Sequence, residues 1–298
     1  MTSCCIPQLS FSFYRHQPIR ADFSGGQISS DAGLLPLRAF DQRYGLTRGL
    51  AERLCDPREE ERVRHSVLSL FRQRLYQVIA GYEDANDADR LRYDPVFQIL
   101  ADQQLGEPLG SQPTLSRLEN SLSPRDLLKL QDALLGWFVK ICGKQVRKRG
   151  EILLDVDSTD DPTHGQQQLS FFNGGYNQHM YHPLLIFERH TGCLLAARLR
   201  PGRVVSHARI IPLLLRIVPR LQREFPNVRI QLRADAGFAT PLLYEFCEVF
   251  GIQYTIGIGN NSRLQSEAQR LQHHLAKRYR RTGVPQRSFS SFRYRAHP

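Results

Sequence analysis

The sequence predicts a mixed α/β protein in which a helical N-terminal part precedes a part built around a sheet. Apolar residues recur at helical spacing from about Ser30 to Lys148, and short strand-like apolar runs begin after Gly150. The length of 298 residues is enough for two domains and at least one sizeable core. We therefore expect three segments, at 1–148, 149–262 and 263–298.

The first segment is predicted to be a short arm followed by an all-helical domain. Residues 1–25 are polar and aromatic, with phenylalanines spaced as in a short strand, at Phe11, Phe13 and Phe23. Apolar stripes then predict helices at Leu34, Leu35, Leu37 and Phe40, and at Val67, Leu68, Leu70, Phe71, Leu75 and Val78. A long amphipathic helix covers 126–141, and Pro124 can begin it.

The second segment alternates strands and helices. Strands are expected at 151–157, 183–188, 193–199, 227–234 and 252–258, with helices at 206–225 and 241–250. The second and third strands are joined by a turn at 190–192. The resulting order, β-β-β-α-β-α-β, is that of the ribonuclease-H-like core with its final helix missing. In that core the first and fourth strands are neighbours, so Asp157 and Asp235 would end on adjacent strand tips.

The charge favours a polyanionic partner. The net charge is +11 and the pI about 9.7. Residues 263–298 hold nine Lys or Arg and one acid, Glu267, and a second cluster at 140–149 contains no acid. The alternative is a solvated surface or a disordered tail. Phosphate neutralisation is the commoner use of such clusters, so we assign DNA contacts to Lys144, Arg147, Lys148, Arg278, Arg280 and Arg281.

Several classes of protein do not match the sequence. Charges interrupt every apolar stretch before it reaches the length of a membrane span. The N-terminus lacks the basic and apolar regions of a secretory signal. The six cysteines include no CxxC pair, which suits a reducing cytoplasm and argues against zinc.

Aspartates at the ends of two predicted strands suggest a metal site. Asp155 and Asp157 are two residues apart and share one face of their strand, and Asp235 ends the fourth strand. Phosphodiester chemistry with two metal ions needs carboxylates that converge from separate elements, and Mg²⁺ (or Mn²⁺) prefers such oxygens. Asp160 and Asp161 are interpreted as a turn with Pro162. Taken alone, Asp235 would more often cap a helix.

A candidate DNA-recognition helix covers 111–120. Ser111 can cap it, and Leu115 and Leu118 face inward. The outward side chains suit base edges and phosphates, and they are Gln112, Thr114, Ser116 and Arg117. An ordinary short helix in a bundle is the alternative. Between the first two strands lie further aromatic and imidazole side chains that either support DNA or pack a loop, namely Tyr176, His179, Tyr181 and His182.

Three blocks of residues resemble one family. The run at 155–165, followed by Phe-Phe-Asn-Gly at 171–174, resembles the first catalytic block of IS1380-type insertion-sequence transposases, and 233–238 resembles their second. The Gly-rich stretch at 23–33 is also typical. The resemblance covers nearly the whole chain. It implies a DDE transposase that uses magnesium to cut and join transposon ends, with Asp157 and Asp235 as the first two members of the Asp-Asp-Glu set.

The third member of that set is not apparent. In the family the Glu lies on a helix after the fifth strand, beyond a β-rich insertion. Here 288–295 is predicted to be the opening strand of that insertion, and no residues remain for the helix. Three acids near the fifth strand are poor substitutes: Glu245, Glu248 and Glu267. We therefore expect a truncated and inactive transposase.

The alternative function is a non-catalytic DNA-binding regulator that occupies transposon ends. An unrelated metal-dependent nuclease of the same fold is a weaker third interpretation. The expected partner is double-stranded DNA carrying terminal repeats, bound by a homodimer on paired ends, with no membrane. The expected location is the bacterial cytoplasm, in association with the nucleoid.

Overall fold

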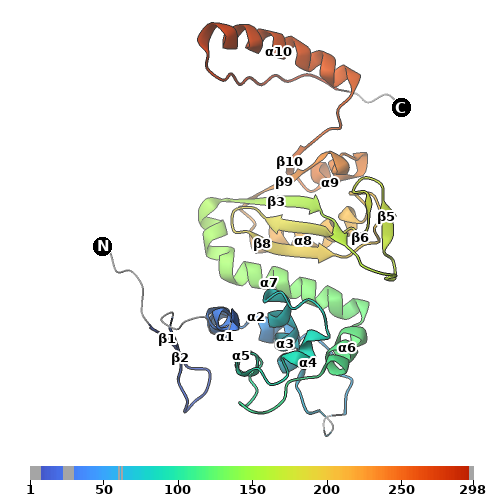
Figure 1. Cartoon of the computed structure of the whole chain (residues 1–298). Helices are drawn as coiled ribbons and strands as arrows, with labels where there is room; N and C mark the ends of the chain where they lie inside the picture. The colour runs from blue at the N-terminus through green and yellow to red at the C-terminus, as the bar shows by residue number, and fades with distance from the viewer. Residues whose placement is uncertain (1–7, 23–29, 60, 62, 295–298) are drawn as a thin grey trace. The chain divides into compact units, whose positions relative to one another are not determined.

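The computed structural model describes residues 8–22, 30–59, 61 and 63–294 of the chain (Figure 1). The expected features at Phe23–Gly26, Ser29 and Arg295 lie outside these residues. The chain divides into two compact units, Met1–Arg149 with Cys193–Ala197, and Gly150–Gly192 with Arg198–Pro298.

The first unit is helical after a short hairpin, as expected. Strands β1 (Gln8–Phe11) and β2 (Ile19–Asp22) pair antiparallel. The helices that follow are η1 (Ser30–Leu34), α1 (Leu35–Tyr44), α2 (Leu46–Ala51), α3 (Val67–Ile79), α4 (Asp87–Arg90), α5 (Pro95–Leu100), α6 (Gln112–Ser121) and α7 (Pro124–Arg149).

Local chemistry sets several of these helix ends. Gly45 ends α1 with a left-handed φ of 69°, which glycine adopts without a steric cost, and its N–H donates to the Asp41 carbonyl at 2.7 Å. At the start of α7, the Ser123 N–H donates to an Asp126 oxygen at 3.1 Å, and the Asp126 N–H donates to Ser123 Oγ at 3.2 Å. This reciprocal cap satisfies backbone donors that a helix start leaves without partners.

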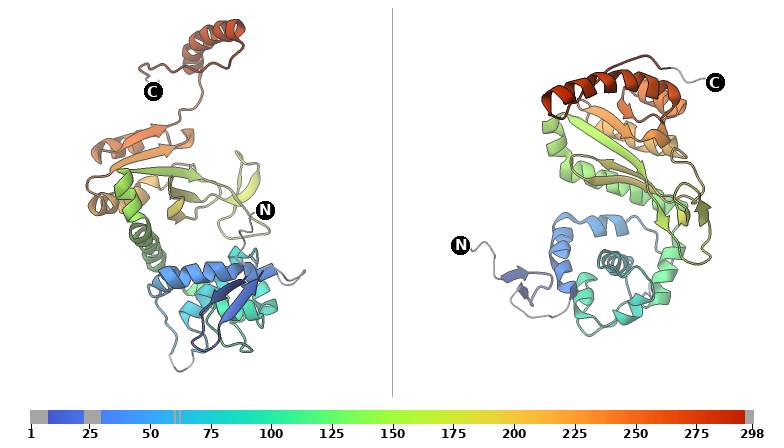
Figure 2. Two further views of the ribbon diagram at one scale, coloured as in Figure 1. Left: turned by 90° about the vertical axis from the view of Figure 1, so that its left-hand side faces the viewer. Right: turned by 45° about the horizontal axis from the view of Figure 1, so that its top comes forward.

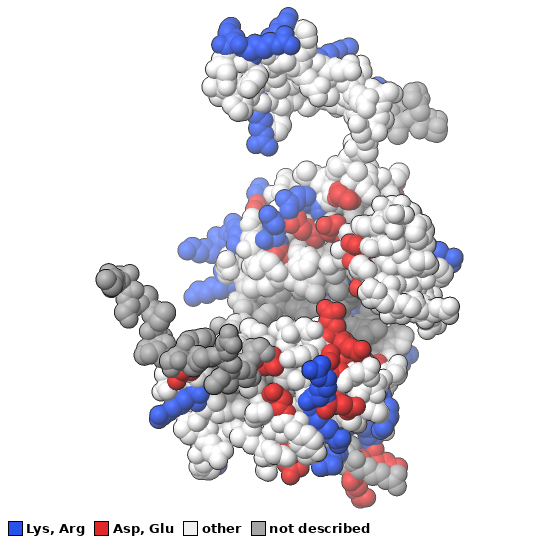
Figure 3. Space-filling view, viewed as in Figure 1, with Lys and Arg blue, Asp and Glu red and all other residues white. Residues whose placement is uncertain are grey.

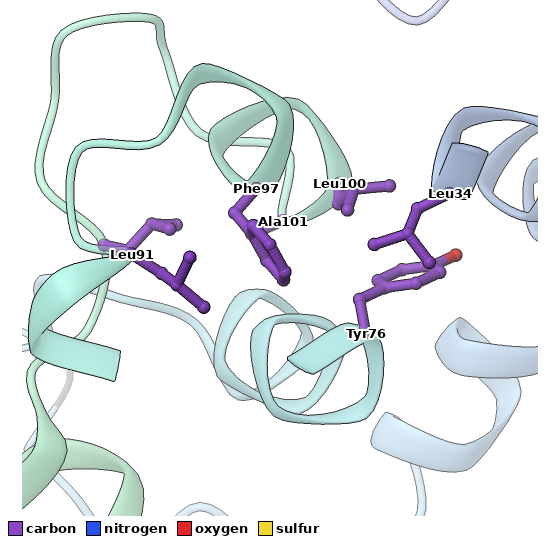
Figure 4. Close-up of a cluster of buried hydrophobic side chains, with 7 residues drawn as sticks. Leu34, Tyr76, Leu91, Phe97, Leu100 and Ala101 are labelled. Carbon is purple, nitrogen blue, oxygen red and sulfur yellow. The ribbon is translucent and has the colours of Figure 1, made fainter. Parts of the chain in front are cut away.

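The apolar core of the first unit lies between α3, α5 and the loops beside them. Figure 4 shows Tyr76 and Phe97 within a cluster of buried side chains that also includes Leu34, Leu91, Leu100, Ala101 and Leu109. Two predicted stripes are only partly buried: Leu37, Phe40 and Val78 are between 44% and 48% exposed. Polar residues of α3 occupy buried positions instead, namely Arg72, Gln73 and Gln77.

The second unit contains most of a five-stranded mixed sheet. The strands are β3 (Glu151–Ser158), β7 (Leu184–Glu188), β8 (Cys193–Arg198), β9 (Arg229–Ala234) and β10 (Gln253–Ile256). Their order is β10-β9-β3-β7-β8, and β3 runs parallel to β9 and antiparallel to β7. The expected neighbourhood of the first and fourth strands is therefore confirmed. The strand core includes Ile152, Leu154, Val156, Leu184, Ile186, Ile230 and Leu232.

Helices α8 (Ile210–Glu224), η3 (Ala236–Phe238) and α9 (Pro241–Val249) connect the later strands. The apolar face of α8 is buried, as expected, through Ile210, Leu213, Leu214, Ile217, Val218 and Leu221. At the predicted turn after β7, the buried Glu188 accepts hydrogen bonds from Thr191 N at 2.8 Å and Thr191 Oγ1 at 2.7 Å.

Two features depart from the sequence predictions. A small sheet forms between β3 and β7, from β4 (Asp161–Pro162), β5 (Phe171–Asn173) and β6 (Gln178–Tyr181), in the order β4-β6-β5. Asp161 and Pro162 therefore lie in a strand rather than a turn. The basic stretch after the fifth strand is helical, as expected: it forms α10 (Ser262–Thr282), which both views in Figure 2 show as continuous. None of its side chains is buried.

The predicted opening strand of the insertion does not form over the part that the structure describes, 288–294. The sequence there alternates Phe with Ser and Arg, but a strand needs a partner for its backbone groups. Among the described residues 283–294, none pairs in a ladder.

Candidate functional site

Strands β3 and β9 bring two aspartates to one edge of the sheet. Their parallel register pairs Val156 with Ala234, so Asp157 and Asp235 are the next residues on neighbouring strands. Side chains alternate between the faces of β3, which buries Val156 and Ser158 and exposes Asp157. On the face in view in Figure 3, acidic side chains gather near the C-terminal end of β3.

Both aspartates are held by their own backbone. Asp157 Oδ1 accepts from the Ser158 N–H at 2.8 Å, and Asp235 Oδ1 accepts from the Gly237 N–H at 2.9 Å as the cap of η3. Both side chains are exposed, and neither forms an ion pair with another described residue. Each carboxylate is therefore oriented through one oxygen while the other faces the surroundings.

Asp155, the third aspartate of the predicted set, has different surroundings from the other two. Arg233 on β9 binds it through both guanidinium donors, with Nε–Oδ1 at 2.7 Å and Nη2–Oδ2 at 2.6 Å. Arg189 Nε lies 3.8 Å from Oδ2. A forked Arg–carboxylate pair of this kind neutralises the acid and fixes its plane. The Asp155–Arg233 ion pair therefore links β3 to β9 two residues before Asp157.

Tyr176, in the segment between β5 and β6, lies within the electrostatic influence of these carboxylates. The Tyr176 pKa is raised above its usual value by burial, and further by the charges of Asp160, Asp157 and Asp235. Its ring meets the His182 ring edge-on, with centroids 5.7 Å apart. Asp160 Oδ2 accepts from Gln178 Nε2 at 2.6 Å. Tyr176 and Asp160 thus share the electrostatic environment of the two strand-end aspartates.

A buried arginine organises the loop beside Asp235. Arg200 Nε donates to the His182 carbonyl at 2.7 Å, and Nη1 donates to the carbonyls of Ser206 and Ala208 at 2.7 and 2.8 Å. Burial lowers its pKa to about 10. Ser206 packs so closely on Gly237 that a Cβ there would lie 2.8 Å from Ser206 Cβ. No sequence pattern indicates this loop, because its bonds join residues that have no common motif.

The donor set suits a hard divalent cation but is small. Asp157 and Asp235 offer the oxygen ligands that Mg²⁺ and Mn²⁺ prefer. Among the described residues, no group of three or more His, Cys, Asp or Glu side chains could hold a metal ion. Glu267, the one acid of α10, lies 3.7 Å from Arg270. With Asp155 paired to Arg233, Asp157 and Asp235 are the two predicted ligands that form no ion pair among the described residues.

The candidate recognition helix forms as α6, with Leu115 buried as expected. Ser111 is the N-cap residue, but its hydroxyl bonds to Thr114 Oγ1 at 3.1 Å and not to the backbone, so the predicted side-chain cap is wrong. Of the four DNA contacts proposed on α6, Arg117 is exposed, and the half-buried ones are Gln112, Thr114 and Ser116.

The basic contacts proposed from sequence are all exposed. Lys144, Arg147 and Lys148 lie in the last turns of α7, and Arg278, Arg280 and Arg281 lie at the end of α10. Figure 3 shows Lys and Arg side chains gathered along α10. No helix among the described residues is both long and apolar enough to cross a membrane.

Two exposed carboxylates at neighbouring strand ends of a mixed α/β domain define a class of sites suited to divalent-metal chemistry. The sequence model described as "Transposase DDE domain group 1" matches residues 11–298. The chain therefore belongs to this family of DDE transposases, as the resemblance indicated at the family level.

Two solved structures show a distant likeness. One is a piggyBac transposase synaptic complex with hairpin DNA, at 14% identity and TM-score 0.31, over 80% of this chain and 52% of that chain. The other is a Mos1 transposase paired-end complex with the left transposon end, at 12% identity and TM-score 0.25, over 78% of this chain and 68% of that chain. The chain thus spans about half the length of the piggyBac chain. No curated protein matches it.

Proposed function

We propose that this protein is an IS1380-type DDE transposase that cleaves and joins DNA at transposon ends with a divalent cation. The observation that carries the proposal is the parallel pairing of β3 with β9, which sets the exposed Asp157 and Asp235 side by side at one sheet edge. The same pairing supports a ribonuclease-H-like interpretation of the sheet. Membership of the DDE family supports metal dependence in general.

In this proposal Asp157 and Asp235 hold Mg²⁺ or Mn²⁺. A bound cation would activate the attacking oxygen and stabilise the leaving oxygen of the phosphodiester. The chain's own contribution is orientation: the backbone N–H groups of Ser158 and Gly237 fix one oxygen of each carboxylate. Arg233 neutralises Asp155, which lowers the repulsion that a third free carboxylate would add.

DNA would be bound through the exposed cations of α6, α7 and α10, whose charge suits phosphate contacts. We further propose that a homodimer of the chain binds two transposon ends. Because the proposed substrate is chromosomal DNA, we expect the protein at the bacterial nucleoid.

A second candidate is a DNA-binding regulator that occupies transposon ends without cutting them. It is favoured by one observation: no third acidic ligand joins Asp157 and Asp235 among the described residues. This function needs the basic surfaces and is indifferent to both aspartates.

One experiment separates the two. The chain is incubated with duplex DNA bearing the terminal repeats of its own element, with Mg²⁺, Mn²⁺ or EDTA, and strand cleavage is followed on denaturing gels. The transposase proposal expects metal-dependent cleavage that Asp235→Ala abolishes, and such cleavage would contradict the inactivity expected from the sequence. Gel shifts on the same DNA compare wild type with Asp157→Ala. Unchanged binding by both, with no cleavage under either metal, would support the regulator and contradict the transposase activity.

A further inference from the structure

A cavity of about 520 Å³ opens in the first unit between the segment after α2 and the start of α6. Its lining is strongly cationic, with four guanidinium groups from Arg58, Arg64, Arg92 and Arg117. Among the lining residues that the structure describes, the acid is Asp56. The proposed DNA contacts Thr114 and Arg117 thus belong to a concave surface and not to a flat helix face.

The carboxylate of Asp56 neutralises Arg58 and not the other three guanidinium groups of the lining. Both Asp56 oxygens are bound by Arg58, with Nε–Oδ1 and Nη2–Oδ2 at 2.7 Å, and this pair lowers the pKa of Asp56 below its usual value. Arg64 Nη2 lies 3.7 Å from Glu107 Oε2 with both side chains at least 60% exposed, which makes a weak pair. The remaining guanidinium groups leave the cavity with an excess of positive charge.

Two buried nitrogens in the lining have no hydrogen-bond partner in the described structure, His65 Nδ1 and Arg92 Nε. The His65 residue is only 8% exposed. Its pKa is lowered from the usual value by burial and then by the charges of Arg64, Arg92 and Arg58. Most buried polar groups have a partner, and leaving one without costs free energy. A ligand that carries both acceptor and donor oxygens, such as a protonated or hydrated phosphate, can provide the missing partners of these nitrogens.

A further feature fits a negatively charged group. Ser111, the N-cap of α6, and Thr114 in its first turn line the cavity. A helix N-terminus carries partial positive charge and tends to bind anions; at α6 the Gln112 N–H already donates to the carboxylate of Asp89 at 3.1 Å. Arginine forks match the geometry of phosphate oxygens, which accept two parallel hydrogen bonds. A phosphate group accepts hydrogen bonds from guanidinium and hydroxyl donors of the kinds that line this cavity.

We propose that this cavity, hereafter the Arg64–Arg117 cavity, binds a phosphate group. If the phosphate belongs to DNA, this inference rests on the proposed function. In that case α6 binds the DNA backbone next to the bases that the outward side chains of α6 contact. The same chemistry accepts a free phosphate, so the test separates the two sources.

The test uses the full chain and follows the imidazole signals of His65 by NMR. Inorganic phosphate is titrated in at fixed ionic strength, with sodium chloride as the compensating salt. Binding should shift the His65 signals saturably and raise the pKa of His65, because an anion offsets the neighbouring guanidinium charges. A short duplex with the terminal repeat should compete for the same shift.

The double variant Arg64→Gln/Arg117→Gln removes two exposed cations without emptying buried space. We expect phosphate affinity to fall about tenfold or more, since hydrogen bonds to charged groups have such values. The slope of log K against log salt for duplex binding should fall by about one for each DNA phosphate that the variant no longer neutralises. The matched control is Arg90→Gln, whose side chain is 82% exposed and lies outside the lining. It should change neither.

Competition by the duplex identifies DNA as the source, and a phosphate-induced shift without competition identifies a free anion. A His65 signal that responds to phosphate no more than to chloride, or a double variant that binds like the control, would overturn the proposal. These readouts need no metal and no cleavage. A failed cleavage assay with intact phosphate binding would therefore count against the proposed activity and not against the cavity.

Discussion

The two units differ in the burial and ion pairing of their carboxylates. In the first unit Asp41 is 4% exposed, accepts from Thr47 N at 2.7 Å, and lies 3.5 Å and 3.6 Å from Arg72 and Arg38. The same two arginines bind Asp102. In the second unit Asp157 and Asp235 are exposed and contact only local backbone N–H groups. A buried carboxylate needs cations and hydrogen bonds to be tolerated.

The difference indicates which acids stabilise the fold and which are available to a ligand. The Asp41 network joins α1, α2, α3 and the loop after α5, so its charges act within the structure. The strand-end pair neutralises nothing in the described chain. Asp155 lies two residues from Asp157, but it resembles Asp41 because an arginine, Arg233, binds it. Substitutions at four places in the chain test this division.

The largest effect is expected at the strand ends. Asp157→Asn and Asp235→Asn keep an oxygen for the backbone N–H but remove the charge, so metal-dependent cleavage should fall by more than about a hundredfold, since even groups that only orient a ligand contribute about 10- to 100-fold. Stability should change by no more than about 0.5 kcal/mol. Asp155→Asn is the matched control: cleavage should persist, with a stability loss of about 1 kcal/mol or less. Equal loss of cleavage in all three variants would contradict the division. Cleavage on gels and urea unfolding measure the two effects.

The next effect concerns the buried network of the first unit. Arg72→Ala should destabilise the protein by about 3–5 kcal/mol, because it leaves Asp41 buried without its full set of partners. Urea unfolding of the full chain measures the change. Arg90→Ala, at an exposed surface pair, should stay within about 0.5 kcal/mol of wild type. A loss at Arg72 no larger than at Arg90 would show that the network contributes little to stability.

A smaller effect is expected where the loop meets the strand end. In Gly237→Ala the new Cβ would lie 2.8 Å from Ser206 and 3.1 Å from Asp235 Oδ1, which forces the two apart at a cost of about 1–3 kcal/mol. The matched control is Gly174→Ala, with no atom within 4 Å of the added group. Thermal unfolding compares the two variants. Equal melting temperatures would show that Ser206 and Gly237 can move apart without a loss of stability.

The smallest effect is a pH dependence at the start of α7. Hydrogen bonds from Ser123 and then from Lys129 hold the Asp126 pKa at about 2, below its ordinary 3.8. A lowered folded-state pKa stabilises the protein above the unfolded value and loses that contribution as pH falls toward 2. Asp126→Ala should therefore be less stable than wild type near neutral pH, and the gap should close between pH 3.8 and about 2. Urea unfolding at a series of pH values measures the gap. A constant gap would contradict the role of the charge.

The sequence alone determined the order of the five main-sheet strands with their connecting helices and the helical nature of the first unit, and it singled out Asp157 and Asp235 as acids at strand ends. These depend on local periodicity and on strand ends, which a chain displays residue by residue. The same periodicity failed for Leu37, Phe40 and Val78, which remain exposed. A stripe shows which residues are apolar, but the neighbouring elements decide which of them are covered.

Only the tertiary structure decided what the charged residues do. Asp155 and Arg233 are 78 positions apart, and Arg38, Arg72 and Asp102 come from three separate segments. Ion pairing depends on distances of a few ångströms between side chains, and spacing along the chain does not encode such distances. For the same reason the sequence did not predict the Arg64–Arg117 cavity or the position of Tyr176 near the strand-end aspartates.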